Sequence, residues 1–77
     1  MQIIEDILRA AEDPRGSLKT HLVYGSNLNF MRLENYLDFL LEKEMLEFTN
    51  EGSKYTITGK GREFLKMAQA TRGFLKE

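Results

Sequence analysis

The 77-residue sequence predicts a mostly helical α+β domain in which three helices, a β-hairpin and a long closing helix follow one another. Two observations lead to this prediction. Apolar residues recur with the period of about 3.6 residues typical of helices over most of the chain, and they alternate with polar residues only between 45 and 58. Hydrophobic residues make up 42% and charged residues 30%, as in folded rather than disordered chains. We therefore expect one domain with a single apolar core.

The first helix is predicted over residues 2–12, because its apolar residues fall on one face at helical spacing. That face consists of Ile3, Ile4, Ile7, Leu8 and Ala11. The segment from Asp13 to Gly16 contains Pro14, which cannot continue a helix, so the helix ends there.

Two further helices are predicted on either side of a tight turn. Ser17 or Thr20 is a candidate N-cap for a short second helix that runs through Tyr24. Gly25, Ser26 and Asn27 form the turn, and Asn29 caps a third helix over residues 29–44. The apolar face of this helix consists of Phe30, Leu33, Leu37, Leu40 and Leu41.

A β-hairpin and a last helix complete the chain. Residues 45–49 and 54–58 alternate around a turn that contains Gly52, which is the pattern of a hairpin. Leu46 and Phe48 would face inward from one strand, and Tyr55 and Ile57 from the other. Thr58 can cap the last helix, over 59–77. The aromatic residues expected in the core, rather than as stacking platforms, are Tyr24, Phe30, Tyr36, Phe39 and Phe48.

This order of elements is that of a winged helix–turn–helix, with a two- or three-stranded wing, in which the helix after the turn enters the DNA major groove. The residues support a closer resemblance. Matching positions are the run 19–30, residues 33, 36, 37 and 40–43, the run 55–61, and residues 64 and 65. With these residues the sequence resembles the small archaeal winged-helix regulators, which include chromatin-type DNA-binding proteins dimerised through a C-terminal coiled coil. The resemblance covers nearly the whole chain and implies DNA binding and archaeal origin.

Charge is unevenly distributed around a formal net value of −1. Residues 54–77 hold six basic and two acidic side chains, whereas residues 30–53 hold six acidic and two basic ones. The basic end favours a DNA partner, and the acidic middle favours a protein partner. The sequence has no apolar run long enough for a membrane span and no signal-peptide pattern, and with no cysteine present we expect a cytoplasmic, nucleoid-associated protein.

Catalytic, metal and cofactor sites are not expected. One histidine without cysteine cannot form a plausible zinc site, and no nucleophile stands beside a base. The Gly59-Lys60-Gly61 segment lacks the third glycine of a dinucleotide-binding loop, because position 64 is Phe64. Its glycines are better explained by the backbone freedom that the chain needs where the wing passes into the last helix.

Three groups of residues are candidate DNA contacts, and a solvated surface is the alternative for each. At the start of the second helix, phosphate contacts are predicted for Lys19, Thr20 and His21, although an uninvolved surface imidazole is the favoured explanation for His21. On the third helix, base contacts are predicted for Asn29, Met31, Arg32 and Asn35. On the wing, Lys54 would contact the backbone. Glu34 and Asp38 would repel phosphates, although a carboxylate can accept a hydrogen bond from cytosine.

The last helix is the predicted dimerisation element, so residues 1–58 would form the DNA-binding domain and 59–77 the helix that joins two copies. Positions 64, 68, 71 and 75 are spaced as a coiled-coil seam requires, and 67, 71 and 74 offer a second seam. The residues assigned to the dimer contact are Met67, Ala70, Thr71, Phe74 and Leu75. Gly73 weakens the helix and would let the last residues fold back on their own domain.

The leading function is a sequence-specific DNA-binding regulator that reads the major groove with the third helix. Two alternatives remain open. One is a winged helix used for protein–protein contact through the acidic middle, and the other is an architectural DNA binder that relies on phosphate contacts.

Overall fold

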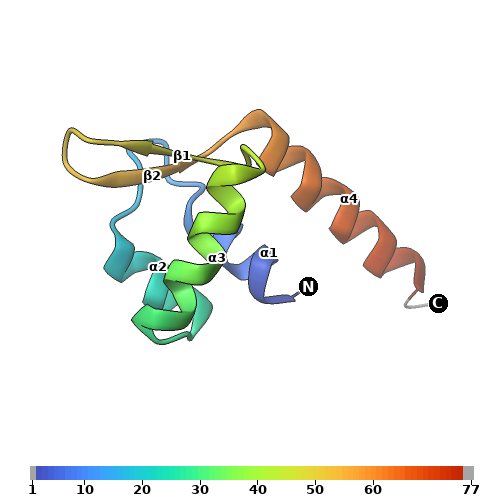
Figure 1. Cartoon of the computed structure of the whole chain (residues 1–77). Coiled ribbons are helices and arrows are strands. Elements are labelled where there is room, and N and C mark those ends of the chain that lie inside the picture. The colour runs from blue at the N-terminus through green and yellow to red at the C-terminus, as the bar shows by residue number, and fades with distance from the viewer. Residues whose placement is uncertain (1, 76–77) are drawn as a thin grey trace.

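A computed structural model describes the chain from residue 2 to residue 75, with the side chains of residues 3–71. The elements are α1 (Gln2–Ala10), α2 (Lys19–Ser26), α3 (Phe30–Glu42), β1 (Leu46–Thr49), β2 (Lys54–Ile57) and α4 (Gly59–Leu75) (Figure 1). Their order confirms the predicted winged helix–turn–helix fold. Helices α1 and α3 each end two residues earlier than predicted, at Ala10 and Glu42, and α2 ends two residues later, so Gly25 and Ser26 belong to the helix and not to the turn.

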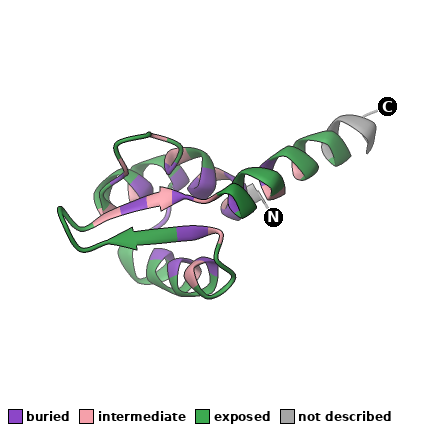
Figure 2. Cartoon of the chain, turned by 90° about the horizontal axis from the view of Figure 1, so that it is seen from above, coloured by how far each residue is buried: buried purple, intermediate pink, exposed green. Residues whose placement is uncertain are grey.

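A single apolar core lies between the three N-terminal helices, the hairpin and the first turns of α4 (Figure 2). The predicted face of α1 is confirmed, because Ile4, Ile7, Leu8 and Ala11 are all buried. The other elements add Leu22, Leu33, Leu37, Leu40, Leu46, Ile57 and Leu65. Each fully buried side chain of this size contributes about 1.5–3 kcal/mol. This packing fixes α2 and α3 against α1.

The helices are capped by neighbouring residues largely as predicted, with one exception. Asn27 adopts a left-handed conformation (φ 60°) after α2, and the Asn29 side chain accepts a hydrogen bond from the Arg32 backbone N–H at 2.8 Å. Thr58 likewise accepts from the Gly61 N–H at 3.0 Å. The predicted cap of α2 by Ser17 or Thr20 is wrong, because its N-cap is Leu18 without a side-chain bond.

Ser17 has a different role, which explains that exception. Its hydroxyl donates to the Ala10 carbonyl at 2.7 Å, and its backbone N–H and C=O both pair with Tyr55 at 2.8 Å. The segment before α2 therefore forms an isolated bridge to β2, at the edge of the two-stranded hairpin.

The hairpin is antiparallel, with Leu46 opposite Ile57 and Phe48 opposite Tyr55. Leu46, Tyr55 and Ile57 face inward as predicted, but Phe48 is 44% exposed, so its assignment to the core is wrong. The Phe48 ring packs on the Tyr55 ring at a centroid distance of 5.0 Å.

Helix α4 begins in close contact with the hairpin and then extends away from the domain, on the side opposite to the wing tip (Figure 1). A Cβ atom on Gly61 would lie 2.4 Å from the Met45 carbonyl oxygen and 2.8 Å from the Ile57 side chain. Leu65 is the last fully packed residue of α4 within residues 3–71, and the following turns project outward. Among the described helices, none combines the length and apolarity that crossing a membrane requires.

Candidate nucleic-acid interface

Helices α2 and α3 form the helix–turn–helix, joined by residues 27–29. Leu28 in the turn is buried in the core, and the Ser26 hydroxyl donates to the Leu22 carbonyl at 2.6 Å. A Cβ atom on Gly25 would lie 2.7 Å from the Ala10 Cβ, so α2 packs directly on α1. The buried side of α3 contains Leu33, Leu37 and Leu40, which leaves its opposite side open to solvent.

The structure brings the predicted base-contacting residues of α3 together at its N-terminal end. We call Asn29, Met31, Arg32 and Asn35 the α3 tip; all four are exposed. Met31 is 76% exposed and lies one turn from Asn35, so the two share a face. The side-chain oxygen of Asn29 accepts the cap bond from the Arg32 backbone N–H, and its amide group has two N–H donors for other partners.

The predicted phosphate contacts of α2 lie beside this tip. Thr20 and His21 are exposed on the first turn of α2. The Lys19 ammonium donates to Oε2 of Glu34 on α3 at 2.9 Å, and this hydrogen bond is the main reason why the pKa of Lys19 is raised. Lys19 is therefore held by a carboxylate of the neighbouring helix, a pairing that the sequence analysis missed because the two residues stand 15 positions apart.

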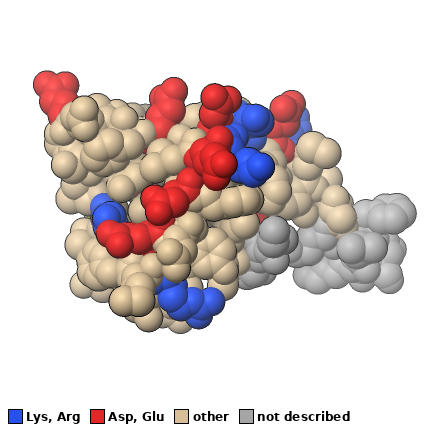
Figure 3. All heavy atoms as spheres, viewed as in Figure 1, with Lys and Arg blue, Asp and Glu red and all other residues tan. Residues whose placement is uncertain are grey.

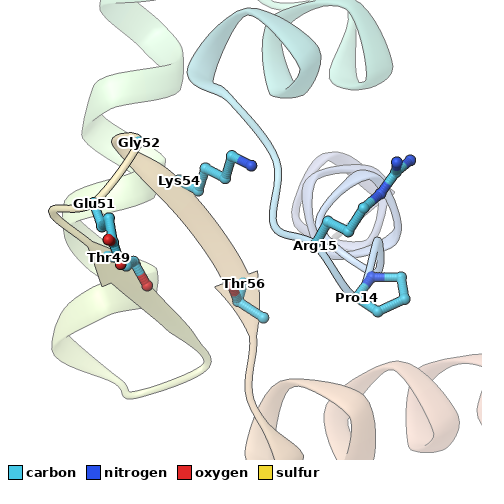
Figure 4. Close-up of a pocket in the computed structure, with 7 residues that line it drawn as sticks. All are labelled: Pro14, Arg15, Thr49, Glu51, Gly52, Lys54 and Thr56. Atoms are coloured by element: carbon cyan, nitrogen blue, oxygen red, sulfur yellow. The ribbon is translucent and has the colours of Figure 1, made fainter.

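Lys54 is the first residue of β2, directly after the turn at the wing tip, and lies opposite Thr49 of β1. It extends from β2 toward the segment that leads into α2, where its stem packs on Gly16, and it is half-buried (Figure 4). Arg15 and Lys54 line one hollow of about 480 Å³, together with Thr49, Glu51 and Thr56. The backbone N–H of Arg15 donates to Asp13 and is the first cause of the lowered pKa of that carboxyl.

Four aromatic residues that the sequence analysis assigned to the core are exposed. In addition to Phe48, they are Tyr24 at 84%, Phe30 at 49% and Phe39 at 41%, whereas Tyr36 is half-buried. Tyr24 follows Leu22 by two residues, which turns it about 200° around the helix axis and away from the core. Tyr24 and Phe30 instead line a shallow hollow between α2 and α3, next to the α3 tip.

Acidic side chains follow the tip along α3. Glu34, Asp38 and Glu42 are exposed and spaced four residues apart, so they form one line on the helix, which we call the acidic ridge. Figure 3 shows Asp and Glu side chains gathered along α3 and on the hairpin, with few Lys or Arg side chains among them. Apart from Glu34, no residue in the first two turns of α3 carries a negative charge.

Helix α4 presents apolar surface beyond the core. Met67 is 65% exposed, and Ala70 and Thr71 are exposed as well. The side chains of Phe74 and Leu75, which belong to the same predicted dimer contact, lie outside the residues whose side chains are described. Within the described part of the chain, no group of three or more His, Asp or Glu side chains is placed to hold a metal ion.

With this fold and surface, the chain belongs to the winged helix–turn–helix family, whose family model matches residues 1–76. The structure is similar to the crystal structure of Sso10a-2, a DNA-binding protein from Sulfolobus solfataricus, with a TM-score of 0.81 and 26% identity. That match covers 97% of this chain and 79% of the other. The predicted resemblance to archaeal winged-helix proteins is thus confirmed.

A curated relative gives the second match. An uncharacterized protein of Methanocaldococcus jannaschii is 33% identical over 66 residues. These residues make up 86% of this chain but 30% of the relative, so the chain spans less than a third of that protein's length.

Proposed function

We propose that this chain binds duplex DNA as a transcription regulator and acts at the nucleoid. The observation that carries the proposal is the α3 tip, where an arginine and an asparagine stand exposed on the helix that follows the turn. Recognition helices of this class contact base edges with their N-terminal residues. The similarity to the DNA-binding protein Sso10a-2 supports the same function.

Six residues of the interface have distinct roles in this proposal. Arg32 hydrogen-bonds a guanine and Asn35 an adenine, because their side chains match the major-groove edges of those bases. Thr20 and His21 contact phosphate oxygens together with the free backbone N–H groups of α2. Lys54 contacts the DNA backbone from the start of β2, next to the wing tip. Met31 provides apolar contact with a thymine methyl group.

A mobility-shift titration with a random duplex pool at several salt concentrations tests the proposal. We expect weak binding. The logarithm of the binding constant should fall linearly with the logarithm of the salt concentration. With about 3 phosphate contacts in each subunit of a dimer, the slope is about −5. Binding that is insensitive to salt would contradict the phosphate contacts, and no binding to any duplex at low salt would contradict DNA binding itself.

The acidic ridge favours a second candidate function, contact with a protein partner. Its three carboxylates repel phosphates along most of the exposed length of α3. A basic partner surface would complement them. The titration separates the two functions, because a protein-contact module has no salt-dependent affinity for DNA. An architectural DNA binder is distinguished by equal affinity for all sequences in the pool.

We also propose that two copies join through α4. Met67, Ala70 and Thr71 are exposed on turns that their own domain does not cover, and Phe74 and Leu75 follow in the sequence at seam positions. Covering the two larger apolar residues in a dimer contributes about 1.5–3 kcal/mol for each side chain. In such a dimer two recognition helices meet one duplex about 34 Å apart.

Sedimentation equilibrium measures this association. At tens of micromolar chain we expect the mass of a dimer, which falls toward the monomer in the double variant Phe74→Ala with Leu75→Ala. A His21→Ala variant serves as the control, because this exposed residue lies on α2, and it keeps the dimer mass. A monomer mass for the unchanged chain, with no difference in the double variant, would exclude the dimer.

A further inference from the structure

The ion pair between α2 and α3 lies inside the proposed DNA interface. Lys19 on the first turn of α2 donates to Oε2 of Glu34, in the second turn of α3, at 2.9 Å. The Glu34 side chain is 59% exposed and that of Lys19 35% exposed. Among the described residues, Oε2 is the only atom of this carboxylate with a hydrogen bond, and most of the side chain is exposed.

Glu34 adjoins the residues that would read bases. It follows Met31 of the α3 tip by three residues, so these two side chains are neighbours on the helix surface, whereas Arg32 projects from the other side of the helix. An ionised carboxylate only accepts hydrogen bonds. In the major groove it therefore fits the amino group of cytosine, whereas the acceptors of guanine and thymine repel it, and in adenine the N7 acceptor lies beside the amino group.

The ion pair with Lys19 reduces the repulsion between Glu34 and the DNA backbone. Without a partner, Glu34 would face the negative DNA backbone and weaken binding to every sequence. The Lys19 ammonium has three N–H donors, of which one is used by Glu34, so the others can reach a phosphate oxygen. One lysine can then hold the carboxylate in position and attach it to the backbone.

We propose that Glu34 is a specificity-determining residue that accepts a hydrogen bond from the exocyclic amino group of cytosine, while Lys19 positions it and contacts a phosphate. This inference rests on the proposed DNA binding. A carboxylate at this position also disfavours other DNA sequences. Where the base opposite Glu34 has no amino group, the carboxylate lies beside hydrogen-bond acceptors and is repelled.

The alternative is a structural clamp between α2 and α3. An exposed ion pair contributes little to stability, and its loss would leave base preference unchanged. The test must therefore read sequence preference and stability separately.

The experiment selects preferred sites from a random duplex pool with the full chain and with its Glu34→Ala variant. Glu42→Ala is the matched control, because it removes the same charge from an exposed site on the same helix, two turns further from the tip. Alanine suits helix positions, so both variants keep the fold, which thermal unfolding verifies.

For the unchanged chain we expect cytosine to be preferred at one position. In Glu34→Ala this preference falls about 10-fold while affinity for other sequences rises, and in Glu42→Ala it stays. A Glu34→Gln variant shifts the preference at that position toward adenine, because an amide both donates and accepts.

Two outcomes overturn the inference and differ in what else they overturn. If the unchanged chain binds DNA and Glu34→Ala keeps its base preference, Glu34 is not a specificity-determining residue, and DNA binding stands. If the unchanged chain binds no duplex at low salt, the proposed function fails together with this inference.

Discussion

Replacing Gly61 with alanine is expected to lower the free energy of unfolding by about 1–3 kcal/mol, the usual cost of forcing an extra group into a packed site. The new Cβ would lie 2.4 Å from the Met45 carbonyl oxygen, which is backbone and cannot rotate away. It would also lie 2.8 Å from the Ile57 side chain. The start of α4 must therefore move off the hairpin, which disturbs the packing of Leu65 as well.

Gly59→Ala is the matched control, because it makes the same chemical change two residues earlier. Nothing lies within 4 Å of a Cβ at that position. Since alanine restricts the unfolded chain and favours helix, Gly59→Ala is expected to keep or slightly raise stability. Urea unfolding followed by circular dichroism compares the two variants. Equal urea midpoints for the two variants would show that α4 can shift without loss of stability. That result would contradict the close packing of Gly61 against Met45 and Ile57.

Replacing Arg32 with alanine is expected to cost about 1–3 kcal/mol on a preferred DNA site and less on random DNA. The arginine is exposed at the α3 tip, and the Asn29 cap fixes the backbone from which it projects. A bidentate bond to guanine depends on that geometry, so its loss removes discrimination as well as affinity.

Lys54→Ala provides the contrast to Arg32→Ala. A lysine that contacts only phosphate contributes equally on all sequences, so this variant is expected to weaken binding uniformly and to make the salt slope less steep by about 1 per subunit. Binding curves on the preferred site and on random duplex measure both effects. If the two variants behave alike, Arg32 contacts only the DNA backbone.

The element order and most caps could be predicted from sequence because they depend on local patterns. The face of α1 follows from helical spacing, and the bonds of Asn29 and Thr58 join residues only three positions apart. Such features depend little on the rest of the fold, which is why the winged helix–turn–helix was predictable from a single sequence.

The features that the sequence does not predict correctly depend on contacts between residues that are distant in the sequence. Local sequence predicts a cap at Ser17, but in the structure the backbone of Ser17 pairs with Tyr55 on β2. Phe48 has the alternation of an inward strand residue, yet of the four residues of β1 only Leu46 is buried. The Lys19–Glu34 pair depends on how α2 and α3 are packed, which no local pattern encodes.

The hydrogen bonds at Thr58 have a consequence for the spacing of the two DNA half-sites that a dimer would contact. The Thr58 hydroxyl donates to the Glu44 carbonyl at 2.7 Å and accepts from Gly61, and its backbone N–H donates to the Met45 carbonyl. One residue thus connects the segment after α3 to the start of α4. If α4 joins two copies, the angle held at this residue sets how far apart the two recognition helices stand, so the spacing of half-sites along the duplex is decided at a position that touches no DNA.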